Sequence, residues 1–358
     1  MKVGIWLVLG LMFSVISAPS MAHAVSATGA AATITVGFSP YGICYDSGKS
    51  EVFVVLNTDP GTVSVISDSN NSVIATVNVG MYPQSAVYDS GKDEIFVTNA
   101  GDPTGTVSVI SDSNNTVTAN VTVQPYSGCL AYDYGKGEIF VVGSDKVSVI
   151  SDTNNTVVAT IDVGQGARGI VYDSGKGEIF VANAGASTVS VVSDSNNTIA
   201  ATVTGVNDAN GLAYDSGKGE IFVTQYNSMS AAVISDSNNS LVTSNIALTA
   251  SNPEFETYSS ATGQIFMTLN AGPGIDVVSD STNAVVGNVT TGGGPLGIAY
   301  DSGKAEIFIV NSEDGTVSVI SDTIFVPELS LPGLILIGIA MTGVAACAIE
   351  LKDRKLKT

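Results

Sequence analysis

Histidine and tryptophan are almost absent from this sequence. The one histidine is His23 and the one tryptophan is Trp6, so both lie in the first 24 residues. The rest of the chain therefore has no imidazole base, no Ser-His or Cys-His pair, and no histidine ligand for a metal ion. These absences exclude most nucleophilic mechanisms and histidine-based metal sites, and we expect a protein that is not an enzyme.

Basic residues are also scarce. Residues 25–326 contain 30 Asp and Glu but only 8 Lys and Arg, a formal charge of −22. A surface this acidic repels nucleic acid and anionic lipid, so neither is expected as a partner. The three cysteines, Cys44, Cys129 and Cys347, lie far apart in the sequence and imply no disulfide framework.

Long apolar runs occur only at the two ends of the chain. Residues 1–24 resemble a signal peptide, with Lys2 before an apolar run and Ala22-His23-Ala24 as a small-x-small cleavage site. Residues 331–349 form a 19-residue uncharged stretch that predicts one transmembrane helix, after a linker at 323–330. The basic tail at 350–358 should remain cytoplasmic, which places the rest of the chain at the cell surface.

Between residues 31 and 322 one unit recurs seven times. Its first marker is a tyrosine, usually followed by aspartate, at Tyr45, Tyr88, Tyr132, Tyr172, Tyr214, Tyr258 and Tyr300. Its second marker is a Ser-Asp pair that ends at Asp68, Asp112, Asp152, Asp194, Asp236, Asp280 and Asp322. Successive tyrosines lie 40 to 44 residues apart, the period of a four-stranded propeller blade.

The residues within each unit favour short antiparallel strands. In the fourth unit, stretches rich in β-branched and aromatic residues at 169–172, 178–183, 188–193 and 198–203 are separated by Gly, Asn, Asp and Ser. The seventh unit lacks its own fourth strand, whereas residues 33–36 stand alone before the first unit. We therefore predict an all-β, seven-bladed β-propeller closed by this N-terminal strand.

The repeated motifs resemble a known family. Gly-Ile-x-Tyr-Asp, Glu-Ile-Phe-Val-x-Asn and Gly-Thr-Val-Ser-Val-Ile-Ser-Asp are similar to the YVTN β-propeller repeats of archaeal and bacterial surface proteins. The sixth unit departs most, with Ser-Ser-Ala-Thr-Gly after Tyr258 in place of Asp-Ser-Gly-Lys. The segment Val326-Pro-Glu-Leu before the apolar stretch resembles an archaeal sorting signal, which implies either cleavage by a sortase-like enzyme or a retained membrane anchor.

The loops that enter each inner strand vary, and in propellers such loops border one mouth of the central channel. The candidate ligand-binding residues on these loops are Tyr41, Tyr82, Tyr126, Arg168, Asp208, Asn210 and Glu254, with Glu256 beside them. An aromatic arc beside an arginine and carboxylates suits a sugar, a peptide or a small molecule. The alternative is that the tyrosines are surface residues without a common role.

Two further sets of residues recur on loops and turns. Candidate ligands for Ca²⁺, the one cofactor considered, are Asp59, Asp102, Asp145 and Asp314, although no Asp-x-Asp-x-Asp spacing is present. Six turn lysines, Lys49, Lys92, Lys136, Lys176, Lys218 and Lys304, form either a ring of cations on one face or solvated turn residues. We favour the second interpretation, with each lysine paired to the glutamate two residues later.

Acceptor sequences for N-glycosylation are also frequent. They occur at Asn70, Asn114, Asn120, Asn154, Asn196, Asn238 and Asn288. Five of them lie in Ser-Asp turns, where Asn-Asn is ordinary turn chemistry as well. We expect some of these sites to be used if the chain is exported, which would make the protein a glycoprotein.

Taken from the sequence, the expected function is binding at the cell surface. The partner would be an extracellular glycan, protein or other ligand, in adhesion or in contact with the cell envelope. One alternative is a carboxylate- or metal-dependent propeller enzyme similar to the propeller lactonases or lyases. Another is a purely structural surface-layer subunit, which would assemble laterally.

Overall fold

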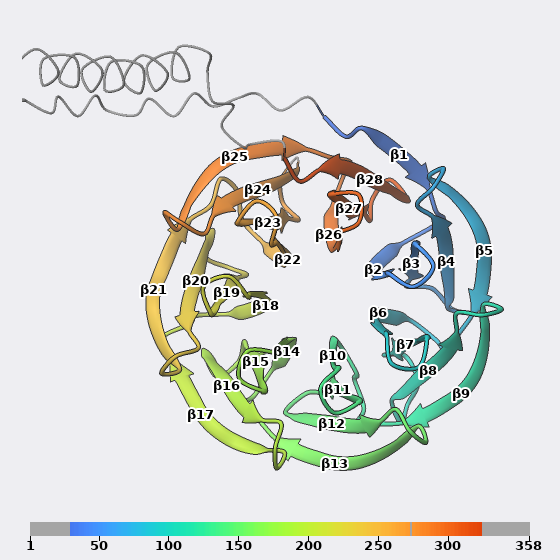
Figure 1. Ribbon diagram of the computed structural model, residues 1–358, viewed down its shortest axis with the longest axis horizontal. Coiled ribbons are helices and arrows are strands. Elements are labelled where there is room, and N and C mark those ends of the chain that lie inside the picture. Colours follow the sequence, from blue (N-terminus) through green and yellow to red (C-terminus); the bar gives the residue numbers. More distant parts are fainter. Residues whose placement is uncertain (1–28, 273, 324–358) are drawn as a thin grey trace, which may run out of the picture.

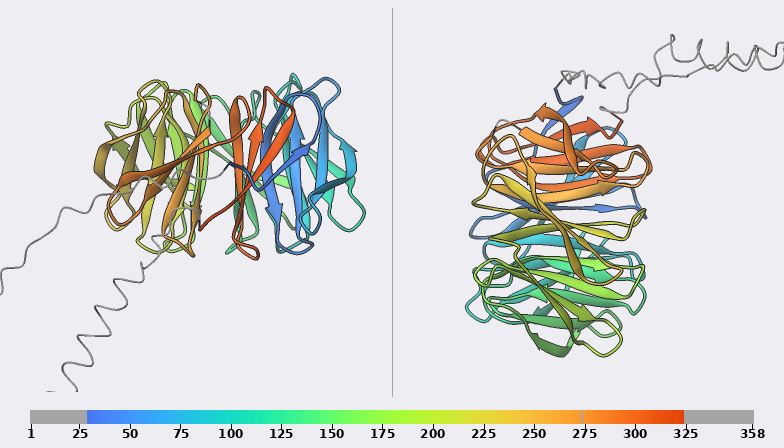
Figure 2. Two further views of the ribbon diagram at one scale, coloured as in Figure 1. Left: turned by 90° about the horizontal axis from the view of Figure 1, so that it is seen from above. Right: turned by 90° about the vertical axis from the view of Figure 1, so that its left-hand side faces the viewer.

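The computed structural model describes residues 29–272 and 274–323, and these form a closed ring of seven four-stranded antiparallel sheets around a central axis (Figure 1). Figure 2 shows that the ring is wider than it is deep. The prediction of an all-β, seven-bladed propeller is therefore confirmed. The predicted signal peptide, transmembrane helix and basic tail lie outside the described residues, and no helix long and apolar enough to cross a membrane occurs among those that are described.

Each blade contributes one strand to each of four positions, counted outward from the axis. The innermost strands are β2 (Pro40–Asp46), β6 (Pro83–Asp89), β10 (Leu130–Asp133), β14 (Ala167–Asp173), β18 (Ala209–Asp215), β22 (Pro253–Ser259) and β26 (Pro295–Asp301). The second strands are β3 (Glu51–Leu56), β7 (Glu94–Asn99), β11 (Glu138–Val142), β15 (Glu178–Asn183), β19 (Glu220–Gln225), β23 (Gln264–Leu269) and β27 (Glu306–Asn311).

The two outer positions follow the same order. The third strands are β4 (Thr62–Ser67), β8 (Thr106–Ser111), β12 (Lys146–Ser151), β16 (Thr188–Ser193), β20 (Ser230–Ser235), β24 (Gly274–Ser279) and β28 (Thr316–Ser321). The outermost strands are β5 (Ser72–Asn78), β9 (Thr116–Thr122), β13 (Thr156–Asp162), β17 (Thr198–Thr204), β21 (Ser240–Ala247), β25 (Ala284–Thr290) and β1 (Ala32–Thr35).

The second and third strands are buried on both faces because each blade is covered by its two neighbours. This explains why they are continuous apolar runs rather than alternating ones. One phenylalanine of each second strand is fully buried, namely Phe53, Phe96, Phe140, Phe180, Phe222, Phe266 and Phe308. The outermost strands each have a single buried residue and are otherwise exposed or half-buried, as expected for sheet edges that face solvent.

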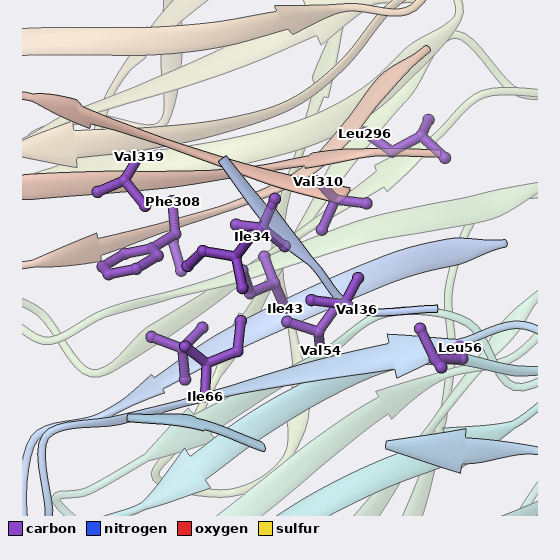
Figure 3. Close-up of a cluster of buried hydrophobic side chains, with 13 residues drawn as sticks. Ile34, Val36, Ile43, Val54, Leu56, Ile66, Leu296, Phe308, Val310 and Val319 are labelled. Atoms are coloured by element: carbon purple, nitrogen blue, oxygen red, sulfur yellow. The ribbon is translucent and has the colours of Figure 1, made fainter. Parts of the chain in front are cut away.

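The ring closes as predicted, through pairing of the N-terminal strand with the last blade. Strand β1 pairs antiparallel with β28, and Ile34 lies opposite Val317. The side chains of Ile34 and Val36 are 5% and 7% exposed and pack with Phe308 of blade seven and Val54 of blade one (Figure 3). The first strand therefore completes one sheet and also fills the seam between the first and last blades.

Two kinds of turn share one face of the ring, which we call the turn face. In the Tyr-Asp turn, Oδ1 of Asp46 accepts hydrogen bonds from the backbone N–H groups of Gly48 at 2.7 Å and Lys49 at 3.2 Å. The sixth blade has Ser259 at this position, yet Gly263 N still donates to Ser259 O at 3.0 Å and the strands remain paired. The turn geometry therefore survives the departure of this unit from the repeat.

The turn lysines do not behave as expected. Nζ of Lys304 lies 2.6 Å from the carbonyl oxygen and 3.3 Å from Oδ1 of Asp68 in the adjoining blade, so the predicted pairing with a nearby glutamate is wrong there. Equivalent contacts to the next Ser-Asp turn join Lys49 to Asp112, Lys136 to Asp194, Lys176 to Asp236 and Lys218 to Asp280. The lysine side chain is long enough to reach the carbonyl of the next blade. Five of the six turn lysines therefore link blades, and Lys304 adds to the closing seam.

Candidate functional site

The face opposite the turns, which we call the mouth face, carries the loops that enter the inner strands. The repeat places one residue four positions before each marker tyrosine, namely Tyr41, Gln84, Gly128, Arg168, Asn210, Glu254 and Leu296. In six of the seven blades the pairing of the first and second strands is irregular at this point. Such bulges change the direction of side chains and are common near binding sites. Six of the seven residues line one cavity.

This cavity, which we call the mouth cavity, has a volume of about 370 Å³. Five of the predicted ligand-binding residues line it: Tyr41, Tyr126, Arg168, Asn210 and Glu254. The sequence had grouped them only as loop residues, and the structure brings them together across blades one, three, four, five and six. A volume in this range is typical of pockets for small ligands.

Polar groups in the mouth cavity form a chain across three blades. Nη1 of Arg168 donates to Oδ1 of Asn210 at 3.3 Å. Nδ2 of Asn210 in turn donates to Oε2 of Glu254 at 2.9 Å and to the Glu254 carbonyl at 3.0 Å. The Arg168 guanidinium also lies over the ring of Tyr226, 5.5 Å from its centroid, which is cation–π geometry. These contacts fix the arginine at the edge of the cavity.

Aromatic side chains form another part of the wall. Tyr41 meets Phe255 edge to face, with ring centroids 6.3 Å apart. Burial raises the pKa of the Tyr41 phenol, and the Glu254 carboxylate raises it further, so Tyr41 stays a neutral hydrogen-bonding group. Burial also raises the pKa of Glu254, while its hydrogen bond from Asn210 and the nearby Arg168 lower it.

Two predicted residues do not join the mouth cavity. Tyr82 and Asp208 stand six positions before the marker tyrosine, as does Tyr126, and both have positive φ values of 45°. Tyr82 is 47% exposed. Oδ2 of Asp208 instead accepts a hydrogen bond from Nδ2 of Asn227 at 3.1 Å. Of the three tyrosines in the predicted aromatic arc, Tyr41 and Tyr126 therefore line the mouth cavity and Tyr82 does not.

Several lining residues were missed by sequence reasoning. Gln84 occupies the same repeat position as Tyr41, so aligning the units on their marker tyrosines would have found it. Phe255 replaces the Gly or small residue found three positions before the other marker tyrosines, which also marks it as unusual. Tyr226 comes from a loop between the second and third strands, and nothing in its local sequence distinguishes it.

A smaller chamber of about 180 Å³ adjoins the mouth cavity within the channel, and the two share Gln84, Cys129, Gly169 and Phe255 as lining residues. Glu256 lines this chamber and is only 8% exposed. Its Oε1 accepts a hydrogen bond from the backbone N–H of Thr224 at 3.1 Å, whereas its buried Oε2 has no partner. Glu256 is therefore a buried carboxyl group that is only half satisfied.

The acidic loop residues considered as Ca²⁺ ligands lie in separate blades, and the polar contacts seen for two of them are local. Oδ2 of Asp314 accepts a hydrogen bond from Gly293 N at 2.7 Å, and Oδ2 of Asp102 accepts one from the hydroxyl of Thr106 at the start of β8. Asp59 and Asp145 belong to two further blades. Within residues 29–272 and 274–323, no three His, Cys, Asp or Glu lie together in a way that would hold a metal ion.

The acceptor asparagines differ in how their side-chain amides are used. The five turn sites at Asn70, Asn114, Asn154, Asn196 and Asn238 are all exposed, and in each the Ser or Thr two residues later donates to Oδ1 at 2.6 to 2.7 Å. Asn120 is exposed on β9. Nδ2 of Asn288, in contrast, donates to Ile275 O at 2.9 Å and Asp276 Oδ1 at 3.1 Å.

This difference predicts an uneven glycan distribution. If the protein is expressed in a host that N-glycosylates exported chains, the turn sites should carry glycan and Asn288 should carry little or none, because its amide nitrogen is hydrogen-bonded within the sheet. Glycopeptide mass spectrometry would measure the occupancy at each site. Occupancy at Asn288 equal to that at Asn196 would contradict the expectation.

The comparisons with known proteins bear on the fold alone. No protein-family model matches this chain, and neither does any curated protein. Among solved structures, hydrazine synthase from Kuenenia stuttgartiensis aligns with a TM-score of 0.72, covering 80% of this chain and 96% of that chain. The sequence identity is 13%, so the similarity supports the propeller architecture and transfers no activity.

Proposed function

We propose that this protein is an exported cell-surface propeller of the YVTN type that binds an extracellular glycan or protein ligand in the mouth cavity. The observation that carries the proposal is the convergence of Tyr41, Tyr126, Arg168, Asn210 and Glu254 on that one cavity. Aromatic faces with a few convergent polar groups are typical of binding sites.

The proposed location rests on the sequence at the two ends. A signal peptide at 1–24 would export the chain, and the apolar segment at 331–349 would hold it in the membrane, either permanently or until a sortase-like enzyme acts on the segment at 326–329. Membrane contact would occur through that helix alone. The acidic surface suits an exposed protein in saline surroundings and disfavours nucleic acid as a partner.

The proposed mode of action is binding without catalysis, with no cofactor. Neighbouring side chains hold the groups of the mouth cavity in place, since Glu254 accepts a hydrogen bond from Asn210 and Tyr41 packs on Phe255. A rigid, preorganised set of this kind lowers the entropy lost when a ligand binds. Adhesion or contact with the cell envelope needs no more than such a site.

A binding screen tests the proposal. The full-length protein in mild detergent would be screened against glycan and peptide libraries, together with Tyr41→Ala and Arg168→Gln. Tyr82→Ala is the matched control, because Tyr82 lies on the same face but outside the cavity. We expect a saturable ligand whose affinity falls at least about tenfold in the first two variants, as for loss of one charged or aromatic contact, and is unchanged in the third.

Two outcomes would overturn the proposal. One is a ligand that binds equally well to all four proteins, which would place its site elsewhere. The other is the absence of any ligand together with lateral self-association on concentration, which would favour a structural surface-layer subunit. Because Arg168 is exposed, Arg168→Gln should fold even if the loss of the partly buried Tyr41 ring lowers stability.

A further inference from the structure

Arg168 is the only arginine of the propeller, and it forms no ion pair with a carboxylate of residues 29–272 and 274–323. The four ion pairs among the described residues all use lysines, namely Lys49, Lys146, Lys218 and Lys304. The side-chain hydrogen bond of Arg168 in the described residues goes to the neutral amide oxygen of Asn210. A guanidinium has five N–H donors, so most of them remain for a ligand.

Asn210 separates the charge of Arg168 from the nearest carboxyl group. Its amide oxygen faces Arg168, and its amide nitrogen is bonded to Oε2 of Glu254 at 2.9 Å. Glu254 is itself only 9% exposed, and burial favours its neutral form. In the mouth cavity, the exposed cation Arg168 therefore lies beside the buried carboxyl group of Glu254, with the uncharged Asn210 between them. This exposed positive charge stands out in a propeller whose formal charge is −22 over residues 25–326.

The surroundings of Arg168 also orient the guanidinium. Tyr226 supports one face of it at 5.5 Å from the ring centroid, and Asn210 holds one nitrogen. With one face stacked and one nitrogen hydrogen-bonded, the guanidinium still has a free edge of N–H groups that can bind a planar ligand group with two oxygen atoms. Carboxylates match this geometry because two parallel N–H···O bonds form at once.

The aromatic rings next to it suit the rest of such a ligand. Tyr41 and Tyr126 line the same cavity, and Tyr126 is 76% exposed. Tyrosine rings contact the C–H faces of sugars and apolar peptide side chains while keeping a polar tip in water. The cavity thus combines one anion-binding fork with aromatic surface, within about 370 Å³.

We propose that the ligand of the mouth cavity carries a carboxylate group, and that this carboxylate binds the guanidinium of Arg168. The inference rests on the proposed binding function and adds the chemical class of the ligand. Two sources supply this chemistry: the uronic acid of an extracellular glycan and the free C-terminus of a peptide. Both place a planar carboxylate next to a body that can pack on Tyr41 and Tyr126.

Matched pairs of probes test the inference on the full-length protein. The first pair is an oligosaccharide ending in glucuronic acid and the same oligosaccharide ending in glucose. The second pair is a short tyrosine-containing peptide with a free C-terminus and its C-terminal amide. In the pair that corresponds to the natural source, the acid should bind about 10- to 100-fold more tightly than its neutral counterpart, as measured by isothermal titration or ligand-observed NMR.

Variants of Arg168 assign that preference. Arg168→Gln should remove the difference between acid and neutral probe, and Arg168→Lys should keep part of it, because the charge remains but the fork is lost. Lys146→Gln is the control for a lost cation, since Lys146 is already paired with Asp162. It should leave both affinities unchanged. Thermal melting of each variant would verify that it is folded.

The outcomes separate this inference from the proposed function. A screened ligand that depends on Tyr41, but binds equally well to Arg168→Gln and lacks a carboxylate, would overturn the inference and leave the binding function standing. Acid probes that bind through Arg168 while Tyr41→Ala has no effect would support the carboxylate contact and contradict the proposed role of Tyr41 in binding. Equal affinity for both members of both pairs, or binding of neither, would overturn the inference.

Discussion

Removing residues 25–37, which include strand β1, should lower the melting temperature of the propeller by about 5–15 °C and make it prone to aggregation. The deletion removes the buried side chains of Ile34 and Val36, worth about 3–6 kcal/mol together if each contributes as a typical buried aliphatic residue. It also exposes the edge of β28, which pairs with β1 over four residues. An exposed, apolar strand edge can pair with other molecules.

Point variants separate the two contributions. Ile34→Ala keeps the backbone pairing and should cost about 2–5 kcal/mol through a cavity in the closing seam. Thr33→Ala, at an exposed position of the same strand, should change stability by no more than about 0.5 kcal/mol. Differential scanning calorimetry would measure all three proteins. If the truncated protein melts at the temperature of the full-length one, the closing role of β1 is wrong.

Glu256→Leu should stabilise the protein, by about 1–2 kcal/mol near pH 8. Two positions before the marker tyrosine, the other six units have Ile43, Ala86, Leu130, Ile170, Leu212 and Ile298. Leu212 and Ile43 there pack close to a glycine of the preceding blade, and the Glu256 carboxyl group lies against Gly211 in the same way. Leucine is therefore compatible with the site and removes a buried oxygen that lacks a hydrogen bond. It also removes the acceptor of the Thr224 N–H, and this loss offsets part of the gain.

The effect should depend on pH in a defined direction. Burial raises the pKa of Glu256 well above its usual range, against the opposing hydrogen bond from Thr224. The stability associated with a raised acid pKa is present at low pH and is lost as pH rises through the folded-state pKa. The advantage of leucine should therefore grow from pH 5 to pH 9. Burial raises the pKa of the neighbouring Cys129 to about 12, so that thiol does not titrate in this range.

Matched variants test this explanation for Glu256. Glu256→Gln should abolish the pH dependence, because it cannot ionise. The reciprocal change Leu212→Glu creates a buried carboxyl group at the equivalent position of blade five and should destabilise the protein by several kcal/mol, about 3 or more at neutral pH. Chemical denaturation at a series of pH values would give each free energy of unfolding. A Glu256→Leu variant that is less stable at every pH would contradict the prediction.

The sequence was sufficient for the architecture because the information is repeated. Tyrosine and Ser-Asp markers at a nearly constant spacing define the blades, and the missing last strand at the end of the seventh unit required residues 33–36 to supply it. The structure places that strand at Ala32–Thr35. Contacts between blades were harder to predict. The local sequence suggested that each turn lysine pairs with the glutamate two residues later, whereas Lys304 contacts Asp68 of the next blade.

The candidate site was only partly predictable, for a related reason. The repeat identifies which loops lie on the mouth face but not which loop residue reaches the channel, because the pairing at the start of six of the seven inner strands is irregular. Tyr82 and Tyr126 occupy the same position of the repeat, six residues before the marker tyrosine, yet only Tyr126 joins Tyr41 in lining the cavity. Packing across blades also creates the chain from Arg168 to Glu254, which no single unit contains.

The pairing of β1 with β28 also determines how the protein can be held. Ala31 N donates to Val319 O at 2.7 Å, so the chain enters and leaves the ring at one corner of blade seven. Strand β28 runs toward the Ser-Asp turn, and this corner is therefore on the turn face, away from the mouth cavity. A tether joined to either end would therefore attach at the turn face, so that the mouth cavity would face away from the point of attachment and stay open.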